Sequence, residues 1–600
     1  MSEPLHGPLE VQHVASLKKT TFEDIPNELL LMIVQYEVLQ PQDYYNLALM
    51  SKTLNLLCLP LYFKAYGMEY PHFRVDIHGG DMDAALVKGR RVMSGLYIAV
   101  HFQPIPTLVF TLRFRPDSQV AYHYGHFNRL RARLASAALF IRAIHSLDDV
   151  VIVGDEEWLW NTGQGPLSDF LLREWVTVMG NFMNALLEKG CSSLQVLRGR
   201  RIVESYTFHQ TQAIKIKHGV KKLLRQALPL RPDTSEDSLD GLRGSGWEFR
   251  RPGKQGYTEN ITMKASAAVL RATGLLHFHI HSTQFLLPPH LSWTLGVLRS
   301  SPNLTSLSLA NITFDKPGEW DTVMALIERS VSPSLRELAF PDFDDNMTNI
   351  DLILNFLYSL NNLEHLELGM LYDRLIPTSV PSLNARAALL PNLRSLSAPI
   401  KASNYLLSTR TWEYNHLIKT WRTFYRNSDI KWDHDPLATQ HFNAIFNNLS
   451  RVLRHRERSS REPMEIIMKL VPTYDFYGFE SNPQILETIK PLGGVDCIVV
   501  ADGMLVHSVD EADFRLGTFL STVFPDAVRV ETKLVHPAIV KALSNGKVPQ
   551  TIQPLLDRLA NFWPSVKRLA LGSWVLNNIS GGGDNIRITK VEEDYHLWAS

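Results

Sequence analysis

The chain has little cysteine and no excess of charge. Its 600 residues include only three cysteines, at positions 58, 191 and 497, too few and too scattered for a disulfide framework or a cysteine-rich zinc site. Such scarcity is typical of a reducing compartment, so we expect an intracellular protein of the cytoplasm or nucleus. The 61 basic and 61 acidic side chains balance, so nucleic acid is not expected as a partner.

Long apolar helices are also missing from the sequence. Two uncharged stretches, 92–112 and 272–298, reach the length of a membrane span. The first contains Pro104 and Pro106, and the second contains four histidines and the pair Pro288-Pro289. We therefore expect strands and turns in both, and no membrane partner. Residues 1–20 lack the basic start and apolar core of a signal peptide, and we expect a flexible tail there.

Catalytic motifs are absent too. The sequence has no Gly-x-Ser-x-Gly elbow and no His-Glu-x-x-His pair, so we expect no catalytic residue, no cofactor and no metal. One alternative stays open. In "LLHFHIHST", His277, His279 and His281 alternate with apolar residues, so a strand would place all three imidazoles on one face. A metal-dependent enzyme built on them would need a further ligand from elsewhere.

What the sequence has in abundance is apolar bulk near its start, in "TFEDIPNELLLMIVQYEVLQPQDYYNLALMSKTLNLLCLPLYF" (21–63). Pro26 suits the first position of a helix, and residues 29–34 are apolar without interruption. Asp43 is expected to cap a second helix, and Pro60 to interrupt the apolar face that follows. So short a unit cannot bury this surplus alone, so either the rest of the chain or another protein must cover it.

This segment resembles an F-box. The similarity is carried by "IPNELLLMI" at 25, "DYYNLALMSK" at 43 and "LPLY" at 59, although Ile25 replaces the usual leucine and Tyr62-Phe63 stand where many members have tryptophan. The resemblance implies docking on a SKP-family adaptor, and through it on a cullin-RING ubiquitin ligase. Carried over position by position, it places these residues at the adaptor: Ile25, Pro26, Leu29, Leu30, Ile33, Leu47, Leu49 and Met50. The alternative is that they only pack on the following domain.

A short template, a turn followed by Leu-x-x-Leu-x-apolar, recurs farther along the chain. It occurs in "SPNLTSLSL" at 301, "SPSLRELAF" at 332, "LNNLEHLEL" at 360 and "LPNLRSLSA" at 390, whose first leucines are 31, 28 and 30 residues apart. Weaker copies begin at 147, 191, 524 and 563, so the array is expected to span most of residues 90–580. Helical patterns at 320–330 and 350–360 separate the strands.

This array resembles a leucine-rich-repeat solenoid. The asparagine or cysteine that usually follows each strand is missing after Leu309, Phe340, Leu368 and Ala398, so a regular asparagine ladder is not expected. A different α/β domain with similar strand starts is the alternative. Residues 230–260 are polar, charged and glycine-rich and predict an exposed insertion, and another break is expected near 455–465.

The sequence thus predicts an α/β protein with a tail (1–20), an all-α F-box (21–66) and an irregular leucine-rich-repeat-like domain of strand-turn-helix units (67–600). The expected function is substrate recognition within an SKP-cullin-F-box ubiquitin ligase. An adaptor-bound scaffold without a ubiquitination target is the alternative. Residues between the buried leucines are expected to face one open surface and contact the target protein: Ser306, Ser308, Glu337, His365, Glu367, Ser395 and Ser397.

Overall fold

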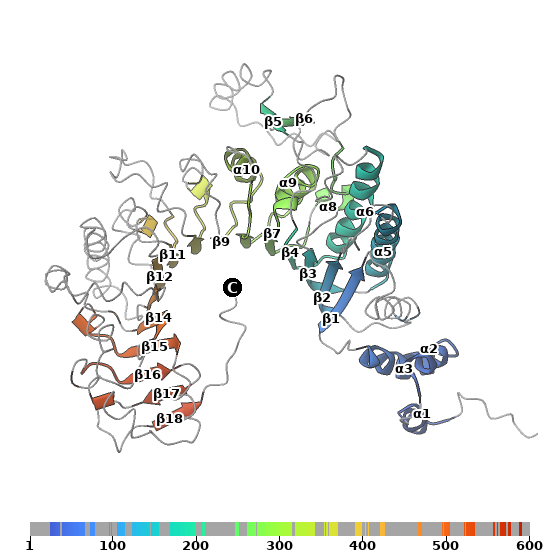
Figure 1. Cartoon of the computed structure of the whole chain (residues 1–600), viewed down its shortest axis with the longest axis horizontal. Helices are drawn as coiled ribbons and strands as arrows, with labels where there is room; N and C mark the ends of the chain where they lie inside the picture. Colours follow the sequence, from blue (N-terminus) through green and yellow to red (C-terminus); the bar gives the residue numbers. More distant parts are fainter. Residues whose placement is uncertain are drawn as a thin grey trace, which may run out of the picture.

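The computed structural model is a mixed α/β protein in which one sheet curves along most of the chain (Figure 1). It describes residues 25–35, 39–66, 72–78, 95, 98, 105–113, 123–144, 146–154, 169–199, 207–210, 247–250, 261–271, 273–314, 319–341, 353, 356–357, 359–369, 390–398, 402–403, 406, 420–425, 465–470, 495, 497–504, 521–522, 524–534, 556–557, 561, 564–571, 574–577 and 587–590. The expected tail, 1–20, and the expected break near 455–465 lie outside these residues.

Sixteen strands form the sheet, and they lie side by side in chain order. Neighbours are parallel from β1 to β16, and β17 and β18 continue the sheet antiparallel. Their bounds are β1 (His72–His78), β2 (Ile105–Arg113), β3 (Leu147–Gly154), β4 (Ser193–Leu197), β7 (His277–His281), β8 (Ser306–Leu309), β9 (Glu337–Phe340), β10 (His365–Leu368), β11 (Ser395–Ser397), β12 (Thr420–Tyr425), β13 (Glu465–Leu470), β14 (Cys497–Met504), β15 (Arg529–Leu534), β16 (Arg568–Leu571), β17 (Trp574–Asn577) and β18 (Arg587–Lys590).

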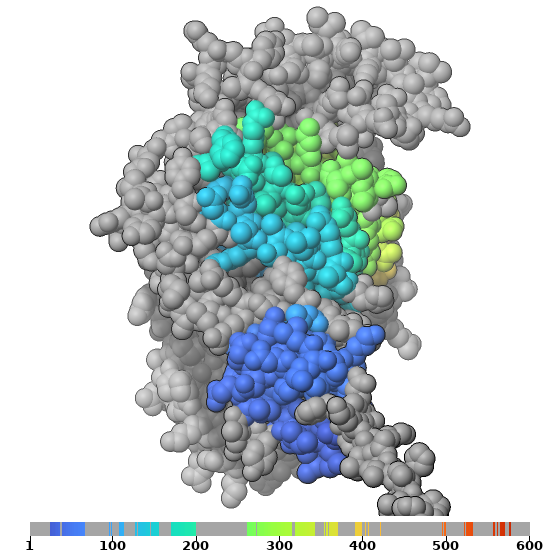
Figure 2. Space-filling model, turned by 90° about the vertical axis from the view of Figure 1, so that its right-hand side faces the viewer, coloured from blue at the N-terminus to red at the C-terminus, as the bar shows by residue number. Residues whose placement is uncertain are grey.

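Helices cover the outer side of the curved sheet, and the strands line its inner side (Figure 1). The outer helices are α5 (His123–Ala143), α6 (Asp169–Glu188), α8 (Ala267–Arg271), α9 (Leu291–Arg299) and α10 (Glu319–Glu328), with the 3-10 helix η4 (Thr283–Leu286). Three more helices, α1 (Asn27–Val34), α2 (Pro41–Ala48) and α3 (Lys52–Ala65), form a lobe of their own beside the first strands (Figures 1 and 2). Parallel neighbours require a crossover between them, which explains the helices on one side.

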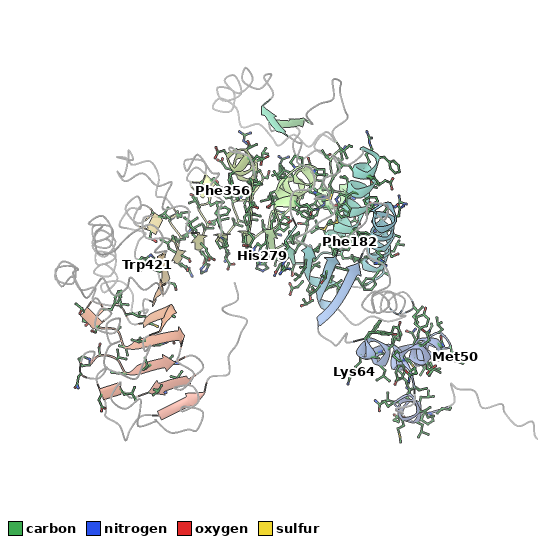
Figure 3. All side chains as sticks on the ribbon, viewed as in Figure 1. Met50, Lys64, Phe182, His279, Phe356 and Trp421 are labelled. Carbon is green, nitrogen blue, oxygen red and sulfur yellow. The ribbon has the colours of Figure 1, made fainter. Side chains whose placement is uncertain are left out.

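Leucines form continuous buried rows across the strands. Leu307 of β8 is in register with Leu338 of β9, Leu338 with Leu366 of β10, and Leu366 with Leu396 of β11. All four are at most 2% exposed. The first leucine of each template, at 304, 335, 363 and 393, is completely buried. Figure 3 shows Phe356 and Phe182 between the sheet and its outer side, whereas His279 lies on the inner side. The strands that the template predicts are confirmed, including those of the weaker copies.

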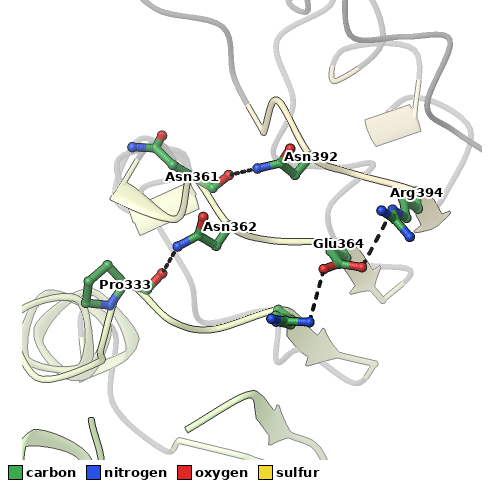
Figure 4. Close-up of polar contacts among 7 residues, drawn as sticks. Pro333, Asn361, Asn362, Glu364, Asn392 and Arg394 are labelled. Atoms are coloured by element: carbon green, nitrogen blue, oxygen red, sulfur yellow. Dashed lines mark hydrogen bonds and ion pairs between the residues drawn. The ribbon is translucent and has the colours of Figure 1, made fainter. Parts of the chain in front are cut away.

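Side chains at the turns link each unit to the one before it. Asn362 Nδ2 donates to the Pro333 carbonyl at 2.9 Å, and Asn392 Nδ2 donates to the Asn361 carbonyl at 3.0 Å (Figure 4). Ser334 Oγ makes the equivalent bond, at 2.7 Å, to the Pro302 carbonyl. These three links lie before β9, β10 and β11, on the residue preceding the first leucine, and not after the strand, where the asparagine of a leucine-rich repeat is usual.

The limits of the sheet and of the insertion differ from the prediction. The sheet begins at His72 and ends at Lys590, so it extends beyond 90–580 at both ends. Within the expected insertion, 230–260, β6 (Trp247–Arg250) is ordered and pairs antiparallel with β5 (Thr207–Gln210). The rest of that insertion lies outside the described residues. Of the predicted helices, 320–330 matches α10, and only single positions of 350–360 are described.

The two uncharged stretches contain strands as expected, β2 in the first and β7 in the second. The second also contains α9, because two residues after the Pro288-Pro289 pair the chain turns into a buried helix. Among the residues that the structure describes, no helix is long and apolar enough to cross a membrane.

Candidate functional site

The three N-terminal helices pack into a small unit with a buried interior. Leu30 and Val34 of α1, Ala48 of α2, and Leu54 and Cys58 of α3 are all at most 3% exposed. Pro26 flanks α1 instead of starting it, because its carbonyl accepts the N–H groups of Leu29 and Leu30 at 3.0 Å. The helix prediction is confirmed, with its start shifted by one residue.

Two further helix ends differ from the prediction. Helix α2 begins at Pro41, and Asp43 is its third residue. There the carboxylate accepts the Gln40 N–H at 2.8 Å, as in a capping box. Helix α3 starts after Ser51, whose hydroxyl accepts the Leu54 N–H, and runs through Pro60 without stopping. Pro60 lies on the exposed side of α3. Because proline has no backbone N–H, the carbonyl four residues earlier lacks its helical hydrogen bond, and water can solvate it on this side.

This unit concentrates exposed apolar side chains. Ten large apolar residues are exposed in the part of the chain that the structure describes, and six of them belong to residues 25–66. These six, which we call the apolar surface of the helical unit, are between 50% and 67% exposed: Leu29, Met32, Ile33, Leu49, Met50 and Leu56. Leu29, Met32 and Ile33 follow helical spacing and lie on one face of α1. Figure 3 shows Met50 at the end of the unit that points away from the sheet.

The adaptor-facing residues expected from the resemblance divide into two groups. Leu29, Ile33, Leu49 and Met50 are exposed, as that role requires, and so is Pro26. Ile25 and Leu47 are only partly exposed and pack against the core. Leu30 is 1% exposed and belongs to the interior of the unit, so its assignment to a surface is wrong. Met32 and Leu56 were missed, although Met32 shares the helical face of Leu29.

The opposite side of the helical unit is attached to the sheet domain. Asn55 of α3 is buried, and its amide donates to the carbonyls of Ala48 at 3.0 Å and Ile98 at 2.9 Å. Gly95 lies so close to Tyr62 that a Cβ atom there would be 2.6 Å from the tyrosine ring. The helical unit therefore packs on the following domain through α3, while the apolar surface stays uncovered. The alternative that these helices pack on the following domain applies to α3, and docking on another protein stays a prediction.

The expected target-contacting residues lie together on the inner face of the sheet. Ser306, Glu337, His365 and Ser395 are consecutive partners across β8 to β11. Ser308, Glu367 and Ser397 belong to the neighbouring row of the same face, with Ala339 between the first two. Glu337 and His365 are exposed, and Ser395 and Glu367 are half-buried. Ser306, Ser308 and Ser397 are buried between longer neighbours, so the expectation that they are open to solvent is wrong.

The three histidines of β7 share this face. Phe278 and Ile280 are buried between them, which confirms the predicted alternation. The rings of His279 and His281 stack with centroids 6.0 Å apart, and His281 Nε2 is 2.9 Å from Ser308 Oγ. Burial, and then the neighbouring imidazoles, lower the pKa of His279 to about 4, and burial lowers the pKa of His281. Both are therefore neutral at pH 7.

These imidazoles do not converge on a metal position. The described part of the chain contains no group of three or more His, Cys, Asp or Glu side chains that could hold a metal ion. The alternative of a metal-dependent enzyme thus finds no ligand set among these residues.

The geometry yields two surfaces, an apolar one on the N-terminal helices and a polar one on the inner face of the sheet. Sequence comparison adds no family assignment: no known family model matches the chain, and a search of curated proteins finds no significant match.

Proposed function

We propose that this protein is the substrate-recognition subunit of an SKP-cullin-F-box ubiquitin ligase. In this proposal, α1 to α3 form an F-box that docks on a SKP-family adaptor. The curved sheet forms a leucine-rich-repeat-like solenoid whose inner face binds the target protein. The sequence resemblance supplies the family, and the observation that carries the proposal is the apolar surface of the helical unit.

The exposed apolar side chains of that surface do not contribute to the buried interior that stabilises the unit. Helices α1 to α3 already have a buried interior, and Asn55 attaches them to Ile98 in the segment between β1 and β2. Burying a large apolar side chain completely is worth roughly 1.5–3 kcal/mol, so each half-exposed side chain would contribute about 1 kcal/mol on binding. Clusters of this kind mark protein interaction sites.

The repeated strands of the curved sheet support the second half of the proposal. From β7 to β11 the parallel strands begin 28 to 31 residues apart. The units of β9, β10 and β11 are each linked to the preceding one at the turn, and a leucine row runs unbroken from β8 to β11. Stacked units of this kind produce extended concave surfaces suited to binding another macromolecule. A target held there would have its lysines kept near the ubiquitin-loaded conjugating enzyme. The rate gain would come from effective concentration, with no catalytic residue in this chain.

The adaptor interface is tested by paired charge substitutions. Leu29→Asp combined with Ile33→Asp places two carboxylates on the exposed face of α1, and we expect adaptor binding to fall by at least about a hundredfold, since burying charges is costly. Leu139→Asp is the matched control, because Leu139 is 59% exposed on α5, one of the outer helices of the sheet. Both proteins are co-purified with the adaptor from the same cells. Equal recovery of adaptor by the double variant and the control would refute the proposal.

A further inference from the structure

The inner face of the sheet carries opposite charges in its two parts. From β1 to β11, its strand positions hold four carboxylates against two arginines: Asp76, Asp149, Glu337, Glu367, Arg74 and Arg113. From β12 to β18 they hold six cations against two carboxylates: Arg422, Lys469, Arg529, Lys533, Arg568, Arg587, Glu465 and Glu531. Asp502 lies in the register shift of β14, outside these rows. The C-terminal part of the inner face is therefore basic.

The cations are most concentrated on the last four strands, at the C-terminal end of the curved sheet (Figure 1). Arg529 of β15, Arg568 of β16, Asn577 of β17 and Arg587 of β18 are consecutive partners across the sheet. Neighbouring strands are about 4.8 Å apart, so the three arginine positions of this row span about 14 Å. Alternate residues of an extended peptide are about 6.7 Å apart, so two or three acidic side chains of one peptide match the row.

Arg568 has the positive charge in this row that no described residue neutralises. The one carboxylate at the inner-face positions of β15 to β18, Glu531, accepts from Arg529 Nε and pairs with its Nη2. The residues beside Arg568 in the row, Arg529 and Asn577, add no negative charge. Arg568 is half-buried, and its Nε is buried without a hydrogen-bond partner in the described part of the chain. Its neighbours thus restrain the side chain, which lowers the entropy cost of fixing it on binding.

We propose that the row centred on Arg568, between Arg529 and Arg587, binds an acidic segment of the target protein. The carboxylates of that segment accept hydrogen bonds from the guanidinium of Arg568, and such charge-assisted bonds are stronger than those between neutral groups. The excess of cations repels a basic segment, so the same strands also discriminate between targets. The inference rests on the proposed function, since it defines what the inner face recognises.

The test uses the full chain and three fluorescein-labelled nonapeptides that alternate serine with glutamate, glutamine or arginine. Fluorescence anisotropy gives each Kd at an ionic strength of about 0.1 M, where the Debye length is about 10 Å. We expect the glutamate peptide to bind at least about tenfold more tightly than the arginine peptide, and Arg568→Gln to weaken its binding about three- to tenfold. Arg568→Lys keeps the charge and should weaken binding less than Arg568→Gln does.

Glu531→Gln tests the proposal in the opposite direction. It removes the one carboxylate at the inner-face positions of β15 to β18, and we expect it to tighten binding of the glutamate peptide about twofold or more. A variant that fails to fold cannot bind more tightly, so this result does not depend on the stability of Arg568→Gln. An unchanged or weaker affinity of Glu531→Gln would overturn the inference.

Arg336→Gln is the matched control, because its side chain is 63% exposed at the entrance of β9, seven strands away from β16. It makes the same change in charge, and we expect it to alter the Kd less than about twofold. Equal effects of Arg336→Gln and Arg568→Gln would overturn the inference, as would equal binding of all three peptides. Tighter binding of a phosphoserine peptide of equal charge would overturn the assignment to carboxylates.

Adaptor co-purification with the same variants separates the two proposals. Equal binding of the three peptides with intact adaptor binding overturns only this inference. Absent adaptor binding by the unaltered chain overturns the proposed function.

Discussion

Because the units are stacked in a row, we expect a destabilising substitution in one strand to lower the stability of that strand and its direct neighbours only. Leu366 is in the middle of the buried row formed with Leu338 and Leu396, and it is 2% exposed. Truncating a buried leucine to alanine typically costs 2–5 kcal/mol, and we expect about 3 kcal/mol for Leu366→Ala because neighbours on both sides are held in register. Since each unit contacts mainly its neighbours, the loss should be confined to β9, β10 and β11.

Hydrogen exchange followed by mass spectrometry measures this directly. A loss of about 3 kcal/mol corresponds to roughly a hundredfold faster exchange of the amides in β10. His365→Ala, one residue earlier and exposed, is the control and should change exchange less than about threefold. Peptides from β3 and β15 should keep their protection in both variants. Unchanged exchange in β10, or equal acceleration in β3 and β10, would refute the description of the fold as a row of locally supported units.

Two further predictions concern the turns and the buried histidine. Asn362→Ala removes the hydrogen bond to the Pro333 carbonyl, and we expect it to destabilise the neighbouring units by about 1 kcal/mol in urea unfolding, whereas Ser359→Ala should preserve that link between units. His290 is completely buried, its Nε2 accepts the Trp175 indole N–H at 3.1 Å, and burial lowers its pKa to about 3. Because the unfolded chain takes up this proton near pH 6.5 and the folded chain does not, stability should fall from pH 6.5 toward pH 3 by about 1.4 kcal/mol per unit. The slope measured with His290→Gln should be smaller by that amount, and an identical slope would contradict the assignment.

Strands β8 to β11 could be predicted because each one carries its own signal. A turn, a leucine and alternating apolar residues recur at each of them, so Leu304, Leu335 and Leu363 could be placed in the core before any contact was known. The rotation of α1 could not be predicted in the same way. Residues 29–34 are apolar all round, and only packing against α3 decides that Leu30 is buried and Leu29 exposed.

Other errors had different physical causes. Asp43 is predicted as the cap of α2, whereas Gln40 is the cap. Pro41 occupies the first helical position, and Asp43 completes a capping box with Gln40. Burial of Ser308 follows from the side chain of His281 leaning over it from the next strand. That neighbour is 27 residues away in the sequence, so no local pattern reveals it.

The central claim is that the apolar surface of the helical unit is a docking site for a SKP-family adaptor. The most direct measurement is the mass of the purified complex, by light scattering, after size-exclusion chromatography of the 68.2 kDa chain mixed with the adaptor. The account predicts a single peak with one adaptor per chain, lost in the variant carrying Leu29→Asp and Ile33→Asp and kept with Leu139→Asp. Separate elution of the unaltered chain and the adaptor would contradict it.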